Sequence, residues 1–271
     1  MFKNILFWCE FPERINWQKL NTFFKNQDFV ADIGIVCTSK QDYLGKAKNI
    51  SKLSNVKLKR AWPVLSKLEG YWFSSQTSRK SIDSLDQYKG MKIKLDIEPP
   101  LPTINSYKRN KFVMDAWLAS QMFKKGKNQK YLWKKVHELI KSGDVMLSTF
   151  SFPRFIAKRM GVLYDKKLSY NYIYYSSFIP KFLRGLYNAY MSRFIKQKLK
   201  FDSETYFAVG LLTPGIFNDE PCYKLISELD HDLKFLLKRG VKNCVVFRLG
   251  SFLELKDSAR WLKVIKKYSQ H

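Results

Sequence analysis

What this 271-residue sequence lacks excludes several classes of protein. Its four cysteines form no CxxC pair and it has three histidines, so neither a disulfide framework nor a His-based metal centre is predicted. It contains neither a GxGxxG nor a Walker phosphate loop. Lys or Arg interrupts every apolar run before the roughly 20 residues that a membrane-spanning helix needs. We therefore expect a soluble protein with no resident metal or other cofactor.

The placement of the cysteines bears on cellular location. Cys9, Cys37, Cys222 and Cys244 are widely spaced, and three of them stand in apolar segments, which favours reduced and buried thiols. The first apolar run ends at Glu10 and is shorter than the core of a secretion signal, so we expect the N-terminus to belong to the fold. Both features predict a cytoplasmic protein.

Charge is strongly unbalanced, with a formal net charge of +26. Such an excess predicts attraction to nucleic acid, to anionic membranes or to other acidic surfaces. The alternative is an ordinary solvated surface, because Lys outnumbers Arg by 38 to 11 and phosphate recognition favours the forked Arg side chain. The segment from Lys181 to Lys200 has the same two interpretations, as a basic amphipathic helix on a membrane or as an outer helix of the fold.

Short apolar runs rich in β-branched and aromatic residues alternate with longer segments whose apolar residues recur every three or four positions. This alternation is typical of parallel strands joined by crossover helices. Eight strands are predicted, at Asn4 to Cys9, Ala31 to Cys37, Val56 to Trp62, Met91 to Glu98, Asp144 to Phe150, Leu168 to Tyr175, Tyr206 to Leu212 and Asn243 to Leu249. Helices are predicted at Trp17 to Lys25, Lys40 to Ser51, Arg79 to Tyr88, Lys111 to Ile140 with a break near Gly126, Pro153 to Met160, Pro180 to Lys198, Cys222 to Arg239 and Asp257 to Tyr268.

Local punctuation agrees with this division of the chain. Ser78 and Asp257 are expected to cap helices, and Gly90, Gly143 and Gly240 stand where a helix must turn into the next strand. No linker rich in Gly, Ser or Pro separates two domains. The sequence therefore predicts an α/β fold, a single (β/α)8 TIM-type barrel over residues 1–271. The long stretch from Pro99 to Asn110 is expected to cover a site.

The fourth predicted strand carries the best functional lead. Side chains alternate along a strand, so one face holds Met91, Ile93, Leu95 and Ile97 and the other holds Lys92, Lys94, Asp96 and Glu98. The apolar face should meet the helices, which directs the charged row into the barrel. Asp96 and Glu98 then lie at the carboxyl end, where barrel enzymes place catalytic groups. A structural ion pair between Lys94 and Asp96 is the alternative.

Two carboxyl groups about 7 Å apart along one strand face can differ in pKa. Glu98, nearer the mouth, is predicted to be a catalytic acid held neutral by burial. Asp96 is predicted to be its catalytic partner, kept ionised by Lys94 and able to stabilise positive charge.

Other predicted strand ends converge on the same rim and supply candidate substrate-binding residues. They are Glu10, Trp62, Tyr174, Tyr175 and Arg248, with Lys94 from the fourth strand. Arg248 stands in an apolar strand, so its charge needs a partner, and Asp96, Glu98 or a substrate anion is expected to provide one. Aromatic faces beside carboxylates suit a sugar ring, although each aromatic residue can equally be ordinary core.

The segment Met91 to Glu98 resembles the catalytic strand of glycoside hydrolase family 18, which ends in a DxxDxDxE pattern. Only the last two acids match, because Met91 and Lys94 replace the other two. The resemblance implies a TIM barrel in which Glu98 is the general acid and Asp96 assists an N-acetyl group that acts as the nucleophile. It also implies that Tyr174 or Tyr175 binds substrate, whereas Arg248 stands where that family usually has Trp.

The leading hypothesis is a barrel hydrolase that acts on a glycan or glycoconjugate, with Glu98 and Asp96 as the acid pair. A second hypothesis is a non-catalytic or weakly catalytic barrel that binds a polyanion or an anionic membrane through its Lys-rich surface. A third is a divalent-metal phosphoesterase that uses Glu10, Asp96 and Glu98.

Overall fold

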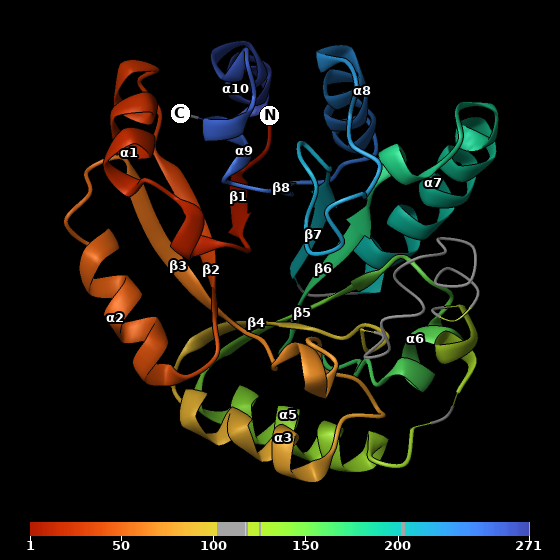
Figure 1. Ribbon diagram of the computed structural model, residues 1–271. Coiled ribbons are helices and arrows are strands. Elements are labelled where there is room, and N and C mark those ends of the chain that lie inside the picture. The colour runs from red at the N-terminus through yellow and green to blue at the C-terminus, as the bar shows by residue number, and fades with distance from the viewer. Residues whose placement is uncertain (102–116, 118, 125, 202–203, 271) are drawn as a thin grey trace.

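A computed structural model describes residues 1–101, 117, 119–124, 126–201 and 204–270. Within these residues the chain forms a closed barrel of eight parallel strands that neighbour one another in chain order, as predicted (Figure 1). The strands are β1 (Asn4–Cys9), β2 (Ala31–Cys37), β3 (Val56–Pro63), β4 (Lys92–Asp96), β5 (Asp144–Phe150), β6 (Ser169–Tyr174), β7 (Glu204–Val209) and β8 (Asn243–Phe247). β8 pairs with β1 and closes the barrel.

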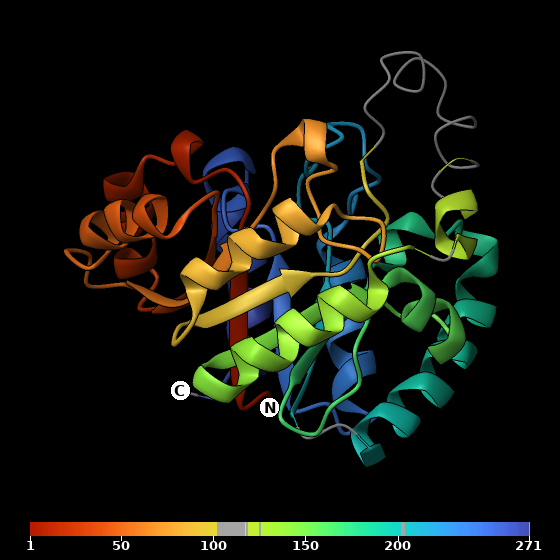
Figure 2. The ribbon, with the colours of Figure 1, turned by 90° about the horizontal axis from the view of Figure 1, so that it is seen from below.

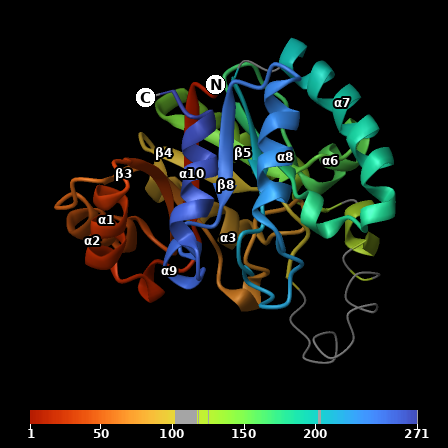
Figure 3. The same cartoon turned by 90° about the horizontal axis from the view of Figure 1, so that it is seen from above.

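Helices surround the strands on the outside (Figures 1 and 3). Those described are α1 (Trp17–Asn26), α2 (Lys40–Ile50), α3 (Arg79–Asp83), α5 (Gln129–Ser142), α6 (Arg154–Met160), α7 (Arg184–Phe201), α8 (Ile226–Leu237), α9 (Ser251–Glu254) and α10 (Ser258–Tyr268). Figure 2 shows α3 and α5 side by side over β4. The chain ends meet where Phe2 pairs with Ser269. No helix in the described ranges is both long and apolar enough to cross a bilayer.

Strand alternation divides the buried side chains of the described residues into two layers. A large outer layer between strands and helices includes Ile93, Leu95 and Ile97 of the fourth predicted strand. A smaller layer inside the barrel includes Trp8 and Trp62. The apolar face of the fourth strand therefore meets the helices, as the sequence indicated, and the charged face points inward, except that Lys92 is exposed at the amino end of the strand.

The predicted boundaries hold to within a few residues for most elements, with instructive differences. Ser78 accepts a hydrogen bond from the backbone of Ser81 and caps α3 as expected, whereas Asp257 precedes α10 but makes no capping hydrogen bond. The predicted helix from Arg79 to Tyr88 is α3 followed by a 3-10 turn. Gly90 and Gly240 both have a φ of +81°, which a glycine adopts without strain.

Two further expectations concern the cysteines and the segment after β4. All four cysteines are free thiols, and Cys222 alone among them is only half-buried. Most of the predicted covering loop from Pro99 to Asn110 lies outside the described residues, as does the start of the helix predicted from Lys111 to Ile140. The described part of that helix is interrupted near Gly126 as predicted: residues 119–123 are helical, and α5 begins at Gln129.

Candidate active site

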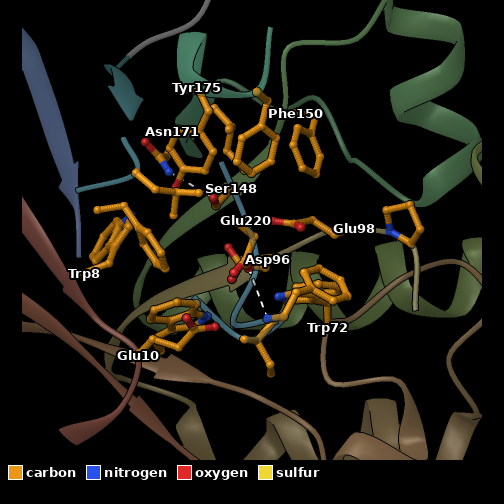
Figure 4. A pocket seen from close by; sticks show the side chains of 18 of the residues that line it. Trp8, Glu10, Trp72, Asp96, Glu98, Ser148, Phe150, Asn171, Tyr175 and Glu220 are labelled. Atoms are coloured by element: carbon orange, nitrogen blue, oxygen red, sulfur yellow. Dashed lines mark hydrogen bonds between the residues drawn. The ribbon is translucent and has the colours of Figure 1, made fainter. Parts of the chain in front are cut away.

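A cavity of about 420 Å³ opens at the carboxyl ends of the strands (Figure 4). Its described walls come from strand ends and the loops that follow them, including Glu10 after β1, Glu98 after β4 and Glu220 after β7. In a parallel barrel these ends meet at one rim, and the loops vary without disturbing the strands. Trp62, Tyr175, Lys94, Asp96, Glu98 and Glu10 of the predicted site line this one cavity.

The floor of the cavity is an ion pair between the inward side chains of β4. Lys94 Nζ donates to Asp96 Oδ2 at 2.8 Å and lies 2.6 Å from Oδ1, so the ammonium is in contact with both carboxylate oxygens. Both side chains are only 3% exposed. The ammonium also lies 3.3 Å from the ring centre of Trp62 and 4.9 Å from that of Trp8. Burial lowers the pKa of Lys94, and the neighbouring Asp96 opposes this shift.

Glu98 stands two residues further along the same face. Its backbone is fixed because its N–H donates to Phe73 O at 3.1 Å, while Phe73 N–H donates to Asp96 O at 3.2 Å. Its side chain is buried, which raises the pKa of the carboxyl group well above its ordinary value, and the charge of Asp96 raises it further. Glu98 therefore holds its proton to a higher pH than an exposed glutamate does.

Beside Asp96 the same barrel layer continues into two neutral polar side chains. Asp96 is in register with Ser148 of β5, and Ser148 with Asn171 of β6. Asn171 Nδ2 donates to Ser148 Oγ at 2.9 Å, which leaves Asn171 Oδ1 buried without a hydrogen-bond partner among the described residues. A ligand hydroxyl or amide could satisfy this acceptor.

A second pair of carboxyl groups meets near Gly215 in the loop after β7. A Cβ placed on Gly215 would lie 2.9 Å from Glu10 Oε2 and 3.1 Å from Glu220 Oε1, so the glycine allows both to approach. Glu10 accepts a hydrogen bond from Tyr71 Oη at 3.3 Å. Burial raises the pKa of Glu10 to about 8, and the charge of Glu220 adds to this shift. Oε2 of Glu10 and Oε2 of Glu220 are buried without partners within the described part of the chain.

Aromatic side chains form the rest of the wall. Trp8 and Trp62 lie with ring centres 6.2 Å apart, and Trp72 contacts Phe217 at 6.0 Å. Tyr175 packs on Phe247 with ring centres 6.0 Å apart. The indole N–H groups of Trp8 and Trp62 are buried and have no hydrogen-bond partner among the described residues. The walls thus combine apolar faces with unsatisfied donors and acceptors, which suits a polar ligand that has apolar faces.

Tyr174 is not part of this cavity, which corrects one prediction. Its side chain points to the helix layer, where it donates to Asn188 Oδ1 at 2.8 Å and stacks between Tyr187 and Phe235. The reason is the alternation along β6, which directs Asn171, Ile173 and Tyr175 inward and Tyr174 outward.

Arg248 is also outside the cavity. Its predicted partners, Asp96 and Glu98, are wrong: Arg248 Nη2 bonds Glu254 Oε2 at 2.7 Å, and its Nε donates to Pro214 O at 2.7 Å. The chain turns directly from β8 into α9, and this places Glu254, the last residue of α9, next to the Arg248 guanidinium. Arg248 lines a separate groove with Phe11.

The cavity is acidic although the protein is basic. Its described lining residues include five carboxyl groups, Glu10, Asp96, Glu98, Asp219 and Glu220, and a single cation, Lys94. In the described ranges no three His, Cys, Asp or Glu side chains are grouped closely enough to hold a metal ion. Lys94, and no metal ligand, is the charged partner of Asp96 among the described residues.

Several lining residues were not predicted. Trp8, Ser148 and Asn171 are inward members of their strands, and the alternation that placed Asp96 would also have found them. Glu220 and Phe217 come from an irregular loop, in which no periodicity marks the side that faces the cavity.

The fold and the position of the cavity together define a (β/α)8 barrel with an acidic site at the carboxyl end of its strands. No protein family matches the sequence, and no curated protein matches it either. Solved structures do match in fold. The glycoside hydrolase domain of PgaB (BpsB) from Bordetella bronchiseptica superposes with a TM-score of 0.56 at 9% identity, over 97% of this chain and 98% of that domain.

Two other barrels are similar. A GH5 family lichenase from a Caldicellulosiruptor species matches with a TM-score of 0.54 and 13% identity, covering 94% of this chain and 84% of that chain. An endocellulase from Pyrococcus horikoshii matches with a TM-score of 0.50 and 10% identity, covering 92% of this chain and 84% of that chain. At such low identity the likeness shows the shared TIM-barrel fold, and these three neighbours are glycoside hydrolases.

Proposed function

We propose that this protein is a glycan-acting hydrolase in which Glu98 is the general acid and Asp96 its partner. The observation that carries the proposal is a buried carboxyl group, Glu98, two residues beyond an ion-paired carboxylate, Asp96, on the inward face of one strand end. Glycoside hydrolysis commonly requires one protonated and one ionised carboxyl group beside the scissile bond.

Burial raises the pKa of Glu98, which favours the protonated form that can transfer its proton to the departing glycosidic oxygen. Asp96 has the complementary role. Its pairing with Lys94 supplies a fixed carboxylate that can stabilise positive charge developing on the sugar, or can orient an acetamido group. The second role is the one that the resemblance to glycoside hydrolase family 18 implies.

The lining indicates what kind of sugar would bind. Trp8, Trp62 and Trp72 offer faces on which a pyranose ring can stack, and the unpaired acceptors of Glu10 and Asn171 can receive its hydroxyl or amino hydrogens. Lys94 is the single cation among the described lining residues and is already paired with Asp96, so it is not available to bind a phosphorylated, sulfated or uronic acid substrate. We therefore propose neutral or cationic glycans. The names of the matched structures, a glycoside hydrolase domain, a lichenase and an endocellulase, agree with a glycan substrate.

The test compares Glu98→Gln with the wild type on mixed-linkage glucan, cello-oligosaccharides, and oligomers of N-acetylglucosamine and of glucosamine. Loss of the proton donor is expected to lower kcat about 10²- to 10⁴-fold on whichever substrate the wild type cleaves. Glu204→Gln is the matched control, because Glu204 begins β7 at the opposite end of the barrel and is exposed. Equal turnover by the wild type and Glu98→Gln contradicts the proposal.

Asp96→Asn separates the two roles proposed for Asp96. If Asp96 orients an acetamido group, this variant loses more activity on N-acetylglucosamine oligomers than on glucans. An equal loss on both assigns Asp96 to general charge stabilisation.

A further inference from the structure

Exposed apolar side chains are concentrated on one side of the barrel. Of the twelve large hydrophobic residues that are exposed in the described part of the chain, six fall between Phe155 and Tyr190. Five of them form what we call the α6–α7 surface: Phe155 (60% exposed), Phe182 (83%), Leu183 (38%), Leu186 (73%) and Tyr190 (39%). Single exposed apolar residues are ordinary, but a group of this kind marks an interaction surface.

Phe155 belongs to α6, Leu186 and Tyr190 belong to α7, and Phe182 and Leu183 form part of the 3-10 turn Lys181–Leu183 that leads into α7. The helices α6 and α7 are neighbours (Figures 1 and 3). Tyr190 of α7 donates through its hydroxyl to Ser151 O, immediately before α6, at 2.6 Å. A groove between the helices is lined by Arg154 of α6 and by Tyr190 and Arg193 of α7. Phe155 and the residues from Phe182 to Tyr190 thus belong to one continuous part of the exterior.

This part of the exterior is also beside the mouth of the acidic cavity. Helices of a βα unit begin at the carboxyl end of the preceding strand, so Phe155 and Phe182 lie near the rim. Phe178, four residues before Phe182, is 36% exposed and also lines the cavity. The apolar surface therefore reaches the edge of the site.

Basic residues accompany the apolar ones. Residues 151–201 contain eleven Lys and Arg and a single acidic residue, Asp165, which is a formal charge of +10 in less than a fifth of the chain. Arg154, Lys181, Arg193 and Lys196 are exposed beside the α6–α7 surface. Apolar side chains flanked by Lys and Arg fit the interface of a bilayer with anionic headgroups. The apolar side chains can insert between the acyl chains, and the anionic headgroups attract the Lys and Arg side chains.

We propose that the α6–α7 surface docks the protein on an anionic lipid bilayer, with the mouth of the cavity beside the contact. Nucleic acid fits less well, because Leu183 and Leu186 cannot stack on bases and gain nothing from a phosphate backbone. A bilayer with anionic headgroups can bind both the apolar and the basic side chains of the α6–α7 surface. The docked protein would meet its substrate at the membrane rather than in bulk solution.

The experiment is co-sedimentation of the full chain with phosphatidylcholine vesicles that contain either no phosphatidylglycerol or about one third of it. Binding is expected only with phosphatidylglycerol and is expected to weaken as NaCl is raised. The double variant Phe182→Ser with Leu186→Ser should lower the affinity for these vesicles by about tenfold or more. Both positions are exposed, so the fold should be retained, which the thermal unfolding curve checks.

Two matched controls make the result specific. Leu44→Ser alters a 52% exposed leucine of α2, which lies on another side of the barrel, and should leave binding unchanged (Figure 1). Arg193→Gln with Lys196→Gln should weaken binding about tenfold, whereas the same loss of charge at the exposed Lys256 and Lys263 should weaken it much less.

Absence of binding to anionic vesicles overturns the proposal. Binding that the Phe182 and Leu186 double variant leaves unchanged overturns it as well. If that binding is lost only when charge is removed, the surface is assigned to a polyanion such as nucleic acid instead.

Discussion

The cavity and the α6–α7 surface differ in the sign of their ionisable side chains, although they adjoin at Phe178, which lines the cavity and stands four residues before Phe182. The cavity presents five carboxyl groups and one ammonium among its described lining residues. The segment 151–201, which carries the α6–α7 surface, has eleven cationic side chains and one anionic side chain. Lys94 and Asp96 form a buried ion pair in the cavity, whereas most of the charged side chains of the segment 151–201 are in contact with water.

The comparison separates net charge from site charge. The formal net charge of +26 comes mostly from side chains on the solvated exterior, where a charge is cheap to hydrate. These exposed charges attract anionic partners over about a Debye length. The few charges inside the barrel are costly to bury, so their pairing decides the chemistry. Removing an interior charge should therefore lower the free energy of unfolding more than removing an exterior one.

The largest effect on stability is expected at Lys94. Lys94→Met keeps an unbranched side chain, shorter by one atom, between Trp8 and Trp62 but leaves the buried carboxylate of Asp96 without its cation. Breaking a buried ion pair on one side costs about 3–5 kcal/mol of unfolding free energy. Urea unfolding at pH 7 measures it.

A double variant tests the cause. Lys94→Met combined with Asp96→Asn removes both charges and should recover much of the lost stability. A loss below about 1 kcal/mol in the single variant, or no recovery in the double variant, would show that the pair does not behave as a desolvated one.

An intermediate effect is expected at Glu10 and depends on pH. Because burial and Glu220 raise its pKa to about 8, the folded protein keeps this proton while the unfolded chain releases it near its ordinary pKa. Wild-type stability therefore falls between about pH 5 and pH 8, by at most about 1.4 kcal/mol per pH unit from this group. Glu10→Gln should remove that slope and gain stability relative to the wild type as pH rises.

Urea unfolding at a series of pH values gives the two stability curves. Glu13→Gln is the control, since Glu13 is exposed in the turn after β1 and should leave the curve parallel to the wild type. A Glu10→Gln curve that is also parallel would mean that Glu10 ionises as freely in the folded state as in the unfolded chain.

The smallest effect is expected at the exterior pair of Lys59 and Asp32. Their charged atoms are 3.3 Å apart, and the two side chains are 45% and 35% exposed. Lys59→Met should cost about 0–1 kcal/mol, and added salt should reduce even that. It is the direct counterpart of Lys94→Met, because both lysines come from barrel strands; equal losses would remove the distinction between interior and exterior charge.

Much of the fold was predictable from the sequence, and the reasons are local. Most strands are short apolar runs between amphipathic helices, and β1, β2 and β5 have the predicted bounds. Helix ends were less certain: Ser78 caps α3, but Asp257 does not cap α10, since capping depends on backbone geometry that residue type alone does not fix.

Site residues on the strands were predictable from strand periodicity, whereas those on loops and short helices were not. Alternation placed Lys94, Asp96 and Glu98 in one cavity with Glu10, Trp62 and Tyr175. Arg248 was misplaced because its partner, Glu254, belongs to α9, and strand periodicity does not show how the chain turns from β8 into that helix. Glu220 was missed for the same reason, as loop conformation depends on contacts distant in sequence. The catalytic roles of Glu98 and Asp96 stay predictions.

The tryptophans of the cavity have a practical consequence. Trp8, Trp62 and Trp72, three of the seven in the chain, are among the described residues that line it, and the Lys94 ammonium lies over the ring of Trp62. Indole emission responds to local polarity and to nearby charge, so a molecule that enters should change the intrinsic fluorescence. The protein thus carries its own optical reporter, with which candidate ligands can be titrated before any turnover is known.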